Sequence, residues 1–593
     1  MSPEQHKKGS DWAVLKRVLG LAIPFRRLFY ISFLAGILVA VITPVRPYLI
    51  QVAVDKNIIQ ENGNGLGLIA FLIFLSIILE FIFKYIFGYF SSNLGQSVMK
   101  HLRTRLFNHV ESMKLGFFDK TPVGIITTRT INDIEAINNI FSEGFITIIT
   151  DLLTLLFVIG FMFFINWKLT LVCLTTFPVM LVCTYVFKEK VRESFHEVRE
   201  KVAQLNAFVQ EHISGMRIIQ IFNAQNREFK KFAQLNHEHY QANDRSVLYF
   251  SIFFPVVEII LALAISLLIW YGSALVIKEE ASIGVFASFI LYLNMAFRPL
   301  RMLADKFNTL QMGLIASERV FRLMDTEEKI EDKGTFSPEN IKGQIRFKNV
   351  WFAYKDENYV LKDVSFEVKE GESLAIVGAT GSGKTSITNV LNRFYEIQEG
   401  KILIDGIDAR EYKLDTLRSY FGAVLQDVFL FSGSILENIT LKNPGISKEQ
   451  VVEAAKLVGA HDFIMELPGQ YDYNVMERGA TLSVGQRQLI SFIRALVYNP
   501  HILILDEATS SIDTESEILI QHAIEKLIKG RTSIIIAHRL STIQNADKIM
   551  VLDKGEIVEM ETHQELLKKP EGYYKKLYDM QFLGDQVAEK QSA

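Results

Sequence analysis

The sequence contains few cysteine and proline residues, and its positive and negative charges nearly cancel. Its 593 residues include two cysteines and 13 prolines, and the formal net charge is −3. Two thiols cannot support a disulfide scaffold, and a hydrophobic content of 49% excludes a disordered or collagen-like chain. Cys173 and Cys183 lie in one apolar run, which predicts small buried side chains with no redox or metal role. The near-neutral charge and the absence of a basic tail argue against a nucleic-acid partner.

Charge and hydropathy are distributed unevenly along the chain. The residues up to Asp325 carry a net charge of +7, and the remainder carries −10. The mean hydropathy of +0.20 is high for a chain with 22% charged residues, so the apolar residues must be concentrated in one part. The polar N-terminus precedes a first apolar run that comes too late and is too long for a cleaved signal peptide. We therefore expect two domains of different kinds.

Six stretches before Asp325 are long and apolar enough to cross a bilayer as helices, which takes about 20 residues each. They are Leu28–Leu49, Leu66–Phe90, Ile146–Ile165, Leu169–Phe187, Val247–Val276 and Ile283–Leu303. Two long polar links, Ser91–Gly144 and Lys188–Ser246, hold six and ten Lys or Arg residues, whereas the short links hold only Lys56, Lys168 and Lys278. The positive-inside rule then predicts that both links and both chain ends are cytoplasmic.

The long links read as helical continuations of the spans. In His196–Ile213, apolar residues recur every three or four positions, and helices this polar are expected to project into the cytoplasm. Within the spans, Glu80 and Lys84 are one helical turn apart, which predicts an ion pair. Glu258 has no opposite charge one turn away in the sequence and is a candidate for the transport path.

The second half of the chain has the pattern of an α/β domain. From Gln344 onward, short apolar runs alternate with helical segments. The runs Ser373–Val377, Ile502–Leu505 and Ser533–Ile536 are continuous and rich in β-branched residues, as expected of parallel strands buried on both faces.

A phosphate-binding loop follows the first of these predicted strands. Residues Gly378–Thr385 match GxxxxGK[ST] and lead into a helical segment starting near Ser386. Backbone N–H groups of such a loop, together with a helix N-terminus, form a concave site for phosphates. Lys384 is expected to reach the β and γ phosphates and Thr385 to ligate Mg²⁺.

Two carboxylates end the strand that begins near Ile502. Asp506 can hold Mg²⁺, and Glu507 can act as a general base on an attacking water. Downstream of a phosphate-binding loop, this acidic pair predicts nucleotide hydrolysis.

Further motifs, in a fixed order, resemble those of one protein family. Leu482-Ser-Val-Gly-Gln-Arg-Gln488 is similar to the LSGGQ signature of ABC transporter ATPases. Gln426 looks like the Q-loop glutamine, Ser510-Ser-Ile-Asp513 like the D-loop and His538 like the switch histidine. Tyr354 is placed like the aromatic residue that stacks on adenine, and Glu477-Arg-Gly479 resembles an exporter-specific loop. With six spans and two long cytoplasmic loops, nearly the whole chain resembles a half-size ABC exporter of the multidrug or lipid type.

The resemblance implies a site for ATP and Mg²⁺. The implied catalytic residues are Glu507, His538 and Gln426. The implied nucleotide-binding residues are Tyr354, Gly378, Ala379, Thr380, Gly381, Ser382, Gly383, Lys384, Thr385, Ser386, Ser483, Gly485, Gln486 and Asp513. The implied metal ligands are Thr385, Gln426 and Asp506.

The resemblance also implies a partner chain. In the family, Ser483 and the backbone of Gly485 contact the γ-phosphate held by the second chain. The loop tips Phe117–Gly124 and Gly215–Ala224 are expected to rest on nucleotide domains. Val484 replaces the first signature glycine and Met476 stands where a glycine is common. The altered signature favours a heterodimer over a homodimer, because exporters with unequal ATP sites are commonly heterodimers.

We therefore expect a helical membrane domain with six spans and long cytoplasmic extensions, fused to a soluble α/β P-loop ATPase domain. The expected boundaries are 1–325 for the membrane domain, 326–343 for a linker, 344–585 for the nucleotide domain and 586–593 for a tail. The expected function is ATP-driven export of lipophilic or amphiphilic compounds across the plasma (inner) membrane, with the nucleotide domain and both termini in the cytoplasm. The alternative is an ATP-gated channel or a regulatory membrane ATPase that moves nothing uphill.

Overall fold

The computed structural model describes residues 8–60, 63–506, 514–536 and 543–579. The chain divides into two compact units. The first, called the membrane domain below, comprises Met1–Glu111 and Val123–Thr326. The second, called the nucleotide domain, comprises Ser112–Pro122 and Glu327–Ala593.

The described residues of the membrane domain fold entirely as helices and the turns between them. The helices are α1 (Lys8–Gly20), α2 (Arg26–Ile42), α3 (Val45–Val52), α4 (Gly63–Glu111), α6 (Val123–Thr128), α7 (Ile134–Asn139), α8 (Phe145–Ile165), α9 (Trp167–Leu174), α10 (Thr176–Ser214), α11 (Met216–Ile221), α12 (Gln225–Ile277) and α13 (Ile283–Met324). Short π-helical segments at Ala53–Ile58, Arg129–Asp133 and Ile140–Gly144 continue several of them. Helices close all backbone hydrogen bonds within themselves, as a hydrocarbon environment requires.

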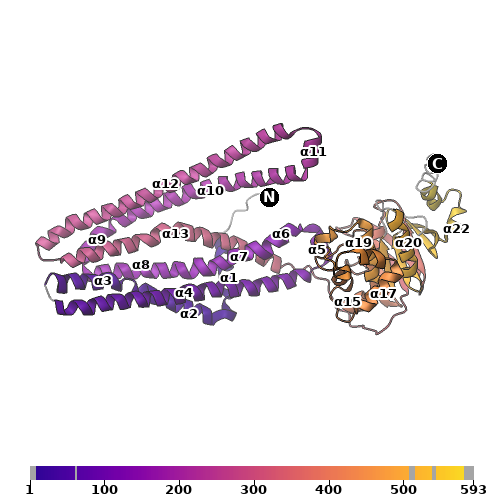
Figure 1. Cartoon of the computed structure of the whole chain (residues 1–593), viewed down its shortest axis with the longest axis horizontal. Coiled ribbons are helices and arrows are strands. Elements are labelled where there is room, and N and C mark those ends of the chain that lie inside the picture. The colour runs from indigo at the N-terminus through magenta and orange to yellow at the C-terminus, as the bar shows by residue number, and fades with distance from the viewer. Residues whose placement is uncertain (1–7, 61–62, 507–513, 537–542, 580–593) are drawn as a thin grey trace. The chain divides into compact units, whose positions relative to one another are not determined.

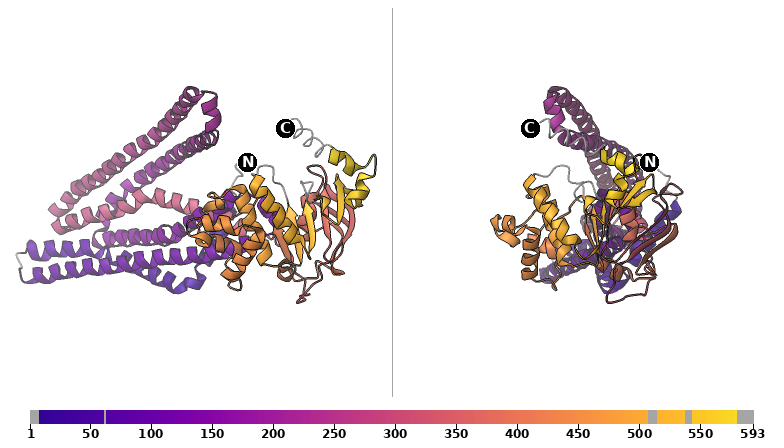
Figure 2. Two further views of the ribbon diagram at one scale, coloured as in Figure 1. Left: turned by 45° about the vertical axis from the view of Figure 1, so that its right-hand side comes forward. Right: turned by 90° about the vertical axis from the view of Figure 1, so that its right-hand side faces the viewer.

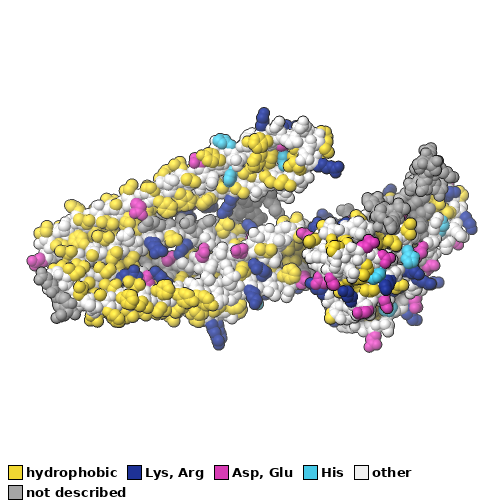
Figure 3. All heavy atoms as spheres, viewed as in Figure 1, with side chains coloured by type: hydrophobic (Ala, Val, Ile, Leu, Met, Phe, Trp, Pro, Cys, Tyr) yellow, Lys and Arg dark blue, Asp and Glu magenta, His cyan; other side chains and the backbone are white. Residues whose placement is uncertain are grey.

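Five described helical stretches are long and apolar enough to cross a membrane, and each contains one predicted span. They are Ile23–Ile58, Gly65–Glu111, Val123–Ile165, Trp167–Ser214 and Gln225–Ile277. The sixth predicted span coincides with a shorter apolar stretch, Ile283–Pro299, at the start of α13. Helix α13 continues without a break from Ile283 to Met324, so the predicted span Ile283–Leu303 lies entirely within it. Hydrophobic side chains cover much of the visible surface of these helices (Figure 3).

The long polar links are helical, as predicted. Helices α4, α10 and α12 run well beyond the spans predicted within them, Leu66–Phe90, Leu169–Phe187 and Val247–Val276. Helices α10 and α12 lie side by side and are joined by the short α11 (Figures 1 and 2). Two ion pairs hold their polar parts together, Lys201 with Glu238 at 2.7 Å and Arg245 with Glu197 at 2.9 Å.

The nucleotide domain contains two sheets with helices packed around them. Its strands are β1 (Ile345–Ala353), β2 (Tyr359–Val368), β3 (Ser373–Val377), β4 (Glu399–Ile404), β5 (Ile407–Asp408), β6 (Phe421–Val424), β7 (Ile502–Asp506), β8 (Thr532–Ile536), β9 (Lys548–Asp553) and β10 (Glu556–Glu561). Its helices are α5 (Leu115–Lys120), α14 (Lys384–Leu391), α15 (Leu414–Ser419), α16 (Ile435–Thr440), α17 (Lys448–Val458), α18 (His461–Glu466), α19 (Val484–Val497), α20 (Thr514–Ile528) and α22 (His563–Leu567).

The two sheets have different strand directions. The smaller has the order β2-β1-β4-β5 and is antiparallel. The larger has the order β10-β9-β3-β8-β7-β6, in which only β10 is antiparallel to its neighbour. All residues of β3 and β8 are buried, which explains why each contains an uninterrupted apolar run, Leu374–Val377 and Ile534–Ile536, rather than alternating apolar and polar residues.

One short segment of the first long link packs with the nucleotide domain. Residues Ser112–Pro122, which include α5, belong to that unit. The backbone N–H of Lys114 donates to the carbonyl of Glu328 at 2.8 Å, and Met113 forms a β-bridge with Lys329. This segment is therefore built into the nucleotide domain, although the chain enters and leaves it from the membrane domain.

Candidate nucleotide site

The register of the parallel sheet brings the predicted site residues to one edge. Ile376 of β3 pairs with Ile536 of β8, and Ile536 pairs with Asp506 of β7. Leu505 pairs with Val424, the last residue of β6. The loop after β3, the carboxylate that ends β7 and Gln426, two residues after β6, thus all lie at the carboxyl edge of the sheet. In open α/β sheets this edge is where ligands bind.

The loop Gly378–Gly383 has a backbone that requires glycine. Gly378, Gly381 and Gly383 have φ angles of 154°, 83° and 108°, which L side chains rarely adopt. A Cβ at Gly378 would lie 2.2 Å from the carbonyl oxygen of Leu552. The glycines therefore let the backbone approach its neighbours closely and turn into α14.

Lys384 begins α14 and folds back over the loop. Its Nζ donates to the carbonyl oxygens of Gly378 and Ala379 at 2.8 and 3.1 Å. Burial lowers the pKa of the Lys384 ammonium from its ordinary value, while the Asp506 carboxylate acts in the opposite direction. Since Asp506 is near enough to act on Lys384, the predicted metal ligand and the predicted phosphate-binding lysine share one site.

The loop also has the features of a phosphate cradle. The buried Ser382 hydroxyl has no hydrogen-bond partner among the described residues. A ligand oxygen could accept a hydrogen bond from it. Thr385 is exposed in the first turn of α14, and Gln426 is also exposed. The described part of the chain contains no cluster of three or more His, Cys, Asp or Glu side chains that could hold a metal.

Three predicted residues, Glu507, Asp513 and His538, lie outside the described residues. By sequence, Glu507 directly follows the last residue of β7, and His538 comes two residues after β8 ends. Their assignments stay predictions.

Tyr354 follows β1 and lies next to α14. Its hydroxyl is 3.1 Å from Ser386 Oγ and accepts a hydrogen bond from Asn389 Nδ2 at 3.1 Å. Its ring meets the rings of Phe352 and Tyr395 edge to face, with centroids 4.7 and 5.0 Å apart. The side chain is 40% exposed. The contacts above fix the position of its ring, so a base could stack on the exposed face.

The sequence did not indicate the contact between Tyr395 and Asp119. The Tyr395 hydroxyl donates a hydrogen bond to Asp119 of α5. Burial, then this bond, raises the pKa of Tyr395 above its ordinary value. A Cβ at Gly116 would lie 3.1 Å from the Tyr395 ring, so α5 approaches closely there. No local pattern could reveal this contact, because its residues are 276 positions apart.

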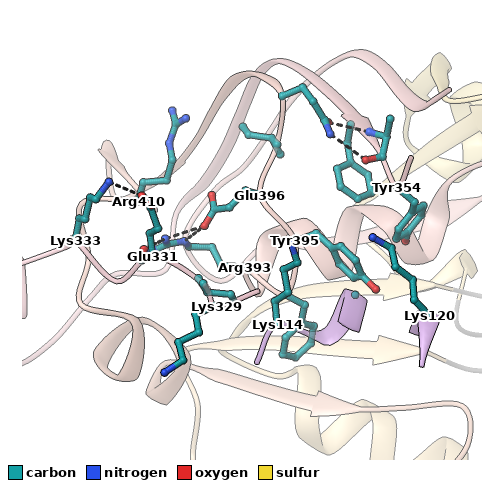
Figure 4. Close-up of a pocket in the computed structure, with 17 residues that line it drawn as sticks. Lys114, Lys120, Lys329, Glu331, Lys333, Tyr354, Arg393, Tyr395, Glu396 and Arg410 are labelled. Carbon is teal, nitrogen blue, oxygen red and sulfur yellow. Dashed lines mark hydrogen bonds and ion pairs between the residues drawn. The ribbon is translucent and has the colours of Figure 1, made fainter. Parts of the chain in front are cut away.

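A cavity of about 500 Å³ opens beside these rings. Figure 4 shows Tyr354 and Lys120 toward one end and Lys333, Glu331 and Arg410 toward the other, with Tyr395 between them. Four of its cations form ion pairs, Arg393 with Glu396, Lys333 with Glu331, Arg410 with Asp408 and Lys114 with Glu328. The lining does not include the Gly378–Thr385 loop, so this space adjoins the aromatic part of the predicted site and not its phosphate part.

The signature segment caps helix α19. Ser483 Oγ accepts from the N–H of Gln486 at 3.1 Å, and the Gln486 side chain accepts from the N–H of Ser483 at 3.0 Å. This capping box occupies the Gln486 side-chain oxygen, whereas the Ser483 hydroxyl keeps its proton for a further acceptor. Gly485 is buried and Ser483 is exposed. The helix N-terminus is thus open to an anion.

The two departures from the family pattern have different structural consequences. Val484 is 48% exposed at the first position of α19, so it is not constrained by packing in this chain. Met476 has φ 56° and ψ −175°, a region adopted almost only by glycine. Its side chain is 54% exposed, so no burial compensates for the backbone strain.

The charges inside the spans have partners that the sequence did not reveal. Glu80 pairs with Lys84 at 2.6 Å, as predicted, and also with Arg46 of α3. Glu258 lies on an exposed part of α12 and has an interaction partner in the structure. It is therefore not the isolated charge that its sequence neighbourhood suggested.

Comparison with known proteins agrees with this geometry. Residues 29–300 match the family model described as ABC transporter transmembrane region. Residues 361–510 match the family model described as ABC transporter. The chain is 40% identical to the ABC transporter ATP-binding protein YknV of Bacillus subtilis (strain 168), over 98% of this chain and 96% of the relative. It is 36% identical to an ATP-dependent lipid A-core flippase of Syntrophus aciditrophicus (strain SB), over 99% and 98% of the two chains. A multidrug export ATP-binding/permease protein of Bacillus subtilis, YgaD, is 36% identical over 96% and 100%.

The chain belongs to the ABC transporters and has the architecture of a half-size exporter. It is an integral membrane protein that binds nucleotide and couples ATP hydrolysis to transport, and proteins of this class work as dimers.

The backbone at Met476 leads to a stability prediction. We expect Met476→Gly to raise the free energy of unfolding by about 1 kcal/mol, because relief of strain outweighs the entropy that glycine adds to the unfolded chain. Thermal unfolding of the purified protein measures the change. Met476→Ala is the matched control, since it shortens the side chain but keeps the strain. An equal gain in both variants would contradict the backbone explanation.

The environment of Tyr354 leads to a binding prediction. Tyr354→Phe keeps the ring but loses the bonds to Ser386 and Asn389, so we expect nucleotide affinity to change less than about threefold, whereas Tyr354→Leu should weaken it about tenfold. Titration with a fluorescent ATP analogue measures both. If Phe and Leu weaken binding equally, the hydroxyl rather than the ring face is what the nucleotide uses.

Proposed function

We propose that this chain exports lipophilic or amphiphilic compounds by alternating access, as one half of a dimer driven by ATP. The observation that carries the proposal is the carboxyl edge of the larger sheet, where Lys384 and Asp506 share a site and the glycine loop leaves a phosphate cradle. The compound class is supported by the relatives that are named as lipid A-core flippases and as a multidrug exporter.

Each residue at this edge has a proposed role in hydrolysis. The N–H groups of Gly378–Gly383 and the Lys384 ammonium bind the phosphates, and Tyr354 stacks on the base. Mg²⁺, when bound by Thr385, Gln426 and Asp506 together with phosphate oxygens, supplies charge stabilisation at the phosphoryl group. Glu507 takes the proton of the attacking water, and His538 donates a hydrogen bond that orients it. Asp513 contributes at the interface with the second chain.

The second chain completes the site. The exposed N-terminus of α19, with the Ser483 hydroxyl and the Gly485 N–H, offers donors to a γ-phosphate held by the partner. Val484 would add bulk beside that phosphate without disturbing its own domain. This arrangement favours a heterodimer. In it, the altered signature of this chain faces the nucleotide held by its partner, while the catalytic residues of this chain itself are intact.

The loop tips provide the proposed coupling. The segment with α5 packs with the nucleotide domain through Asp119 and Lys114. The other tip, around α11, exposes Ile218, Ile221 and Phe222 at 63%, 68% and 76%, an apolar surface suited to docking on a nucleotide domain. We propose that closure of the ATP-bound dimer moves these tips together and reorients the spans.

We propose boundaries at 1–325, 326–343, 344–585 and 586–593, with residues 112–122 packed as part of the nucleotide domain. The basic character of the long links supports a plasma (inner) membrane topology with the nucleotide domain and both termini in the cytoplasm. Uptake of amphiphilic dyes into inverted vesicles tests the function, because an ATP-gated channel would dissipate a gradient that a pump builds. ATP-dependent accumulation supports export, and downhill flux alone contradicts it.

The role of Glu507 gives a kinetic prediction. Glu507→Gln keeps the shape of the side chain but removes the base, so we expect the ATPase rate to fall by at least about 100-fold while ATP binding is retained. The variant should also accumulate as a nucleotide-bound closed dimer. Phosphate release and binding of a fluorescent ATP analogue measure the two effects separately. Hydrolysis within threefold of the unmodified protein would exclude Glu507 as the base.

The exposed Val484 gives a prediction about assembly. In a heterodimer we expect Val484→Gly to change total turnover less than about twofold, because the site it affects contributes little, whereas in a homodimer it would act on both sites. Mass measurement of the chain purified alone, with its ATPase rate, decides which assembly applies. A stable dimer of this chain with brisk, substrate-stimulated ATPase would make the heterodimer proposal wrong.

A further inference from the structure

An ion pair joins the two polar helices of the second long link just before they meet α11. His212 lies in the last turn of α10, and Glu228 lies in the first turn of α12. The distance from His212 Nε2 to Glu228 Oε2 is 3.0 Å, and the two side chains are 19% and 11% exposed. Both residues lie outside the spans predicted within these helices, Leu169–Phe187 and Val247–Val276. We call His212 and Glu228 the tip pair.

The surroundings of His212 call for a proton on each ring nitrogen. Nδ1 lies 2.7 Å from the backbone carbonyl oxygen of Phe208, and Nε2 faces the Glu228 carboxylate. Both neighbours are acceptors, so both nitrogens must donate, which only the imidazolium form can do. A neutral ring would leave a lone pair against an acceptor oxygen. The ring also stacks on Phe208 with centroids 3.6 Å apart, a contact that favours a cation.

The helix ends favour the same two charges. A cation is stabilised in the last turn of a helix and an anion in the first turn. Glu228 also accepts a hydrogen bond from Arg227 Nε at 2.8 Å and pairs with Lys231 at 3.1 Å, both on α12. Glu211, on the same helix as His212, adds a negative charge nearby. The hydrogen bond to Glu228, more than any other influence, raises the pKa of His212 above its ordinary value.

The tip pair differs from the two other ion pairs described above between α10 and α12. Lys201 pairs with Glu238 and Arg245 pairs with Glu197, and these cations stay charged throughout the physiological pH range. A histidine changes its charge within that range. Because the pKa of His212 is raised, the pair is intact at lower pH and is lost as the pH rises through that raised value.

The tip pair lies at the base of the apolar tip. In Figure 1, α11 connects the ends of α10 and α12. Between its two residues the chain exposes the apolar side chains of the tip, Ile218, Ile221 and Phe222. The rings of Phe208 and Phe232 bring the same two helices together, with centroids 6.1 Å apart. The way in which the tip is presented therefore depends on how closely the ends of α10 and α12 are held.

We infer that His212 is a positioning residue for coupling: its imidazolium holds α10 to α12 at the base of the tip, and its deprotonation loosens the surface that docks on a nucleotide domain. The inference rests on the docking role proposed for this tip. Transport should then become less tightly coupled to ATP hydrolysis as the pH rises.

Hydrogen–deuterium exchange of the full-length protein in nanodiscs tests the structural part of this inference without requiring transport. We expect the segment 211–228, after correction for the intrinsic exchange rate, to exchange at least about threefold faster at about pH 9 than at about pH 6. His212→Arg keeps a cation at both pH values and should stay protected, whereas His212→Ala should exchange fast at both. The matched control is His237→Gln, because His237 is an exposed histidine of α12 whose ring contacts Gln241 and not a carboxylate. It should behave like the unmodified protein.

The coupling part is measured on the same variants in proteoliposomes, as amphiphilic dye transported per ATP hydrolysed. Between the same two pH values we expect this ratio to fall at least about threefold more in the unmodified protein than in His212→Arg. An equal pH dependence of the unmodified protein and His212→Arg, in either measurement, would overturn the inference. A change in exchange without a change in the ratio would also overturn it. Absence of ATP-driven transport in every variant would instead refute the export function, and the exchange data would still decide whether His212 holds the tip.

Discussion

The hydrogen bond from Tyr395 to Asp119 helps to hold the short segment Ser112–Pro122 within the nucleotide domain. Asp119 lies in a segment whose flanking helices belong to the membrane domain, yet the segment itself packs with the nucleotide domain. Tyr395 also touches Tyr354 edge to face, and Tyr354 bonds to Ser386 at the start of α14. A short chain of side chains therefore joins the predicted base-stacking ring to α5, a segment of the nucleotide domain that the first long link contributes.

The nucleotide site could be predicted from the sequence because its chemistry is local. The loop Gly378–Thr385 needs glycines at defined φ angles, and the buried strand before it needs an uninterrupted apolar run, so both leave a readable pattern. The helical extensions were predictable for the same reason, since their periodicity is continuous along the chain. The sequence showed only that Met476 stands where a glycine is common. The backbone angles of Met476 explain why a glycine is expected there, since they lie in a region that L residues rarely adopt.

Contacts between distant segments could not be predicted in this way. The sequence paired Glu80 with Lys84 correctly, but Arg46 reaches the same carboxylate from another helix. The neighbour of Glu258 was likewise invisible. Helical periodicity says which residues share a face of one helix, but the choice of facing helix depends on packing.

A buried acid beside two cations is usually read as a means of neutralising them, but here it also determines their geometry. Long basic side chains lose considerable rotamer freedom when they are held in one position. Glu80 accepts a hydrogen bond from Lys84 and pairs with Arg46, so one carboxylate orders two basic side chains from two helices. The same residue reduces the total charge enough for the helices to be inserted in a membrane. One carboxylate therefore both orders two basic side chains and offsets the cost of placing them within apolar helical stretches.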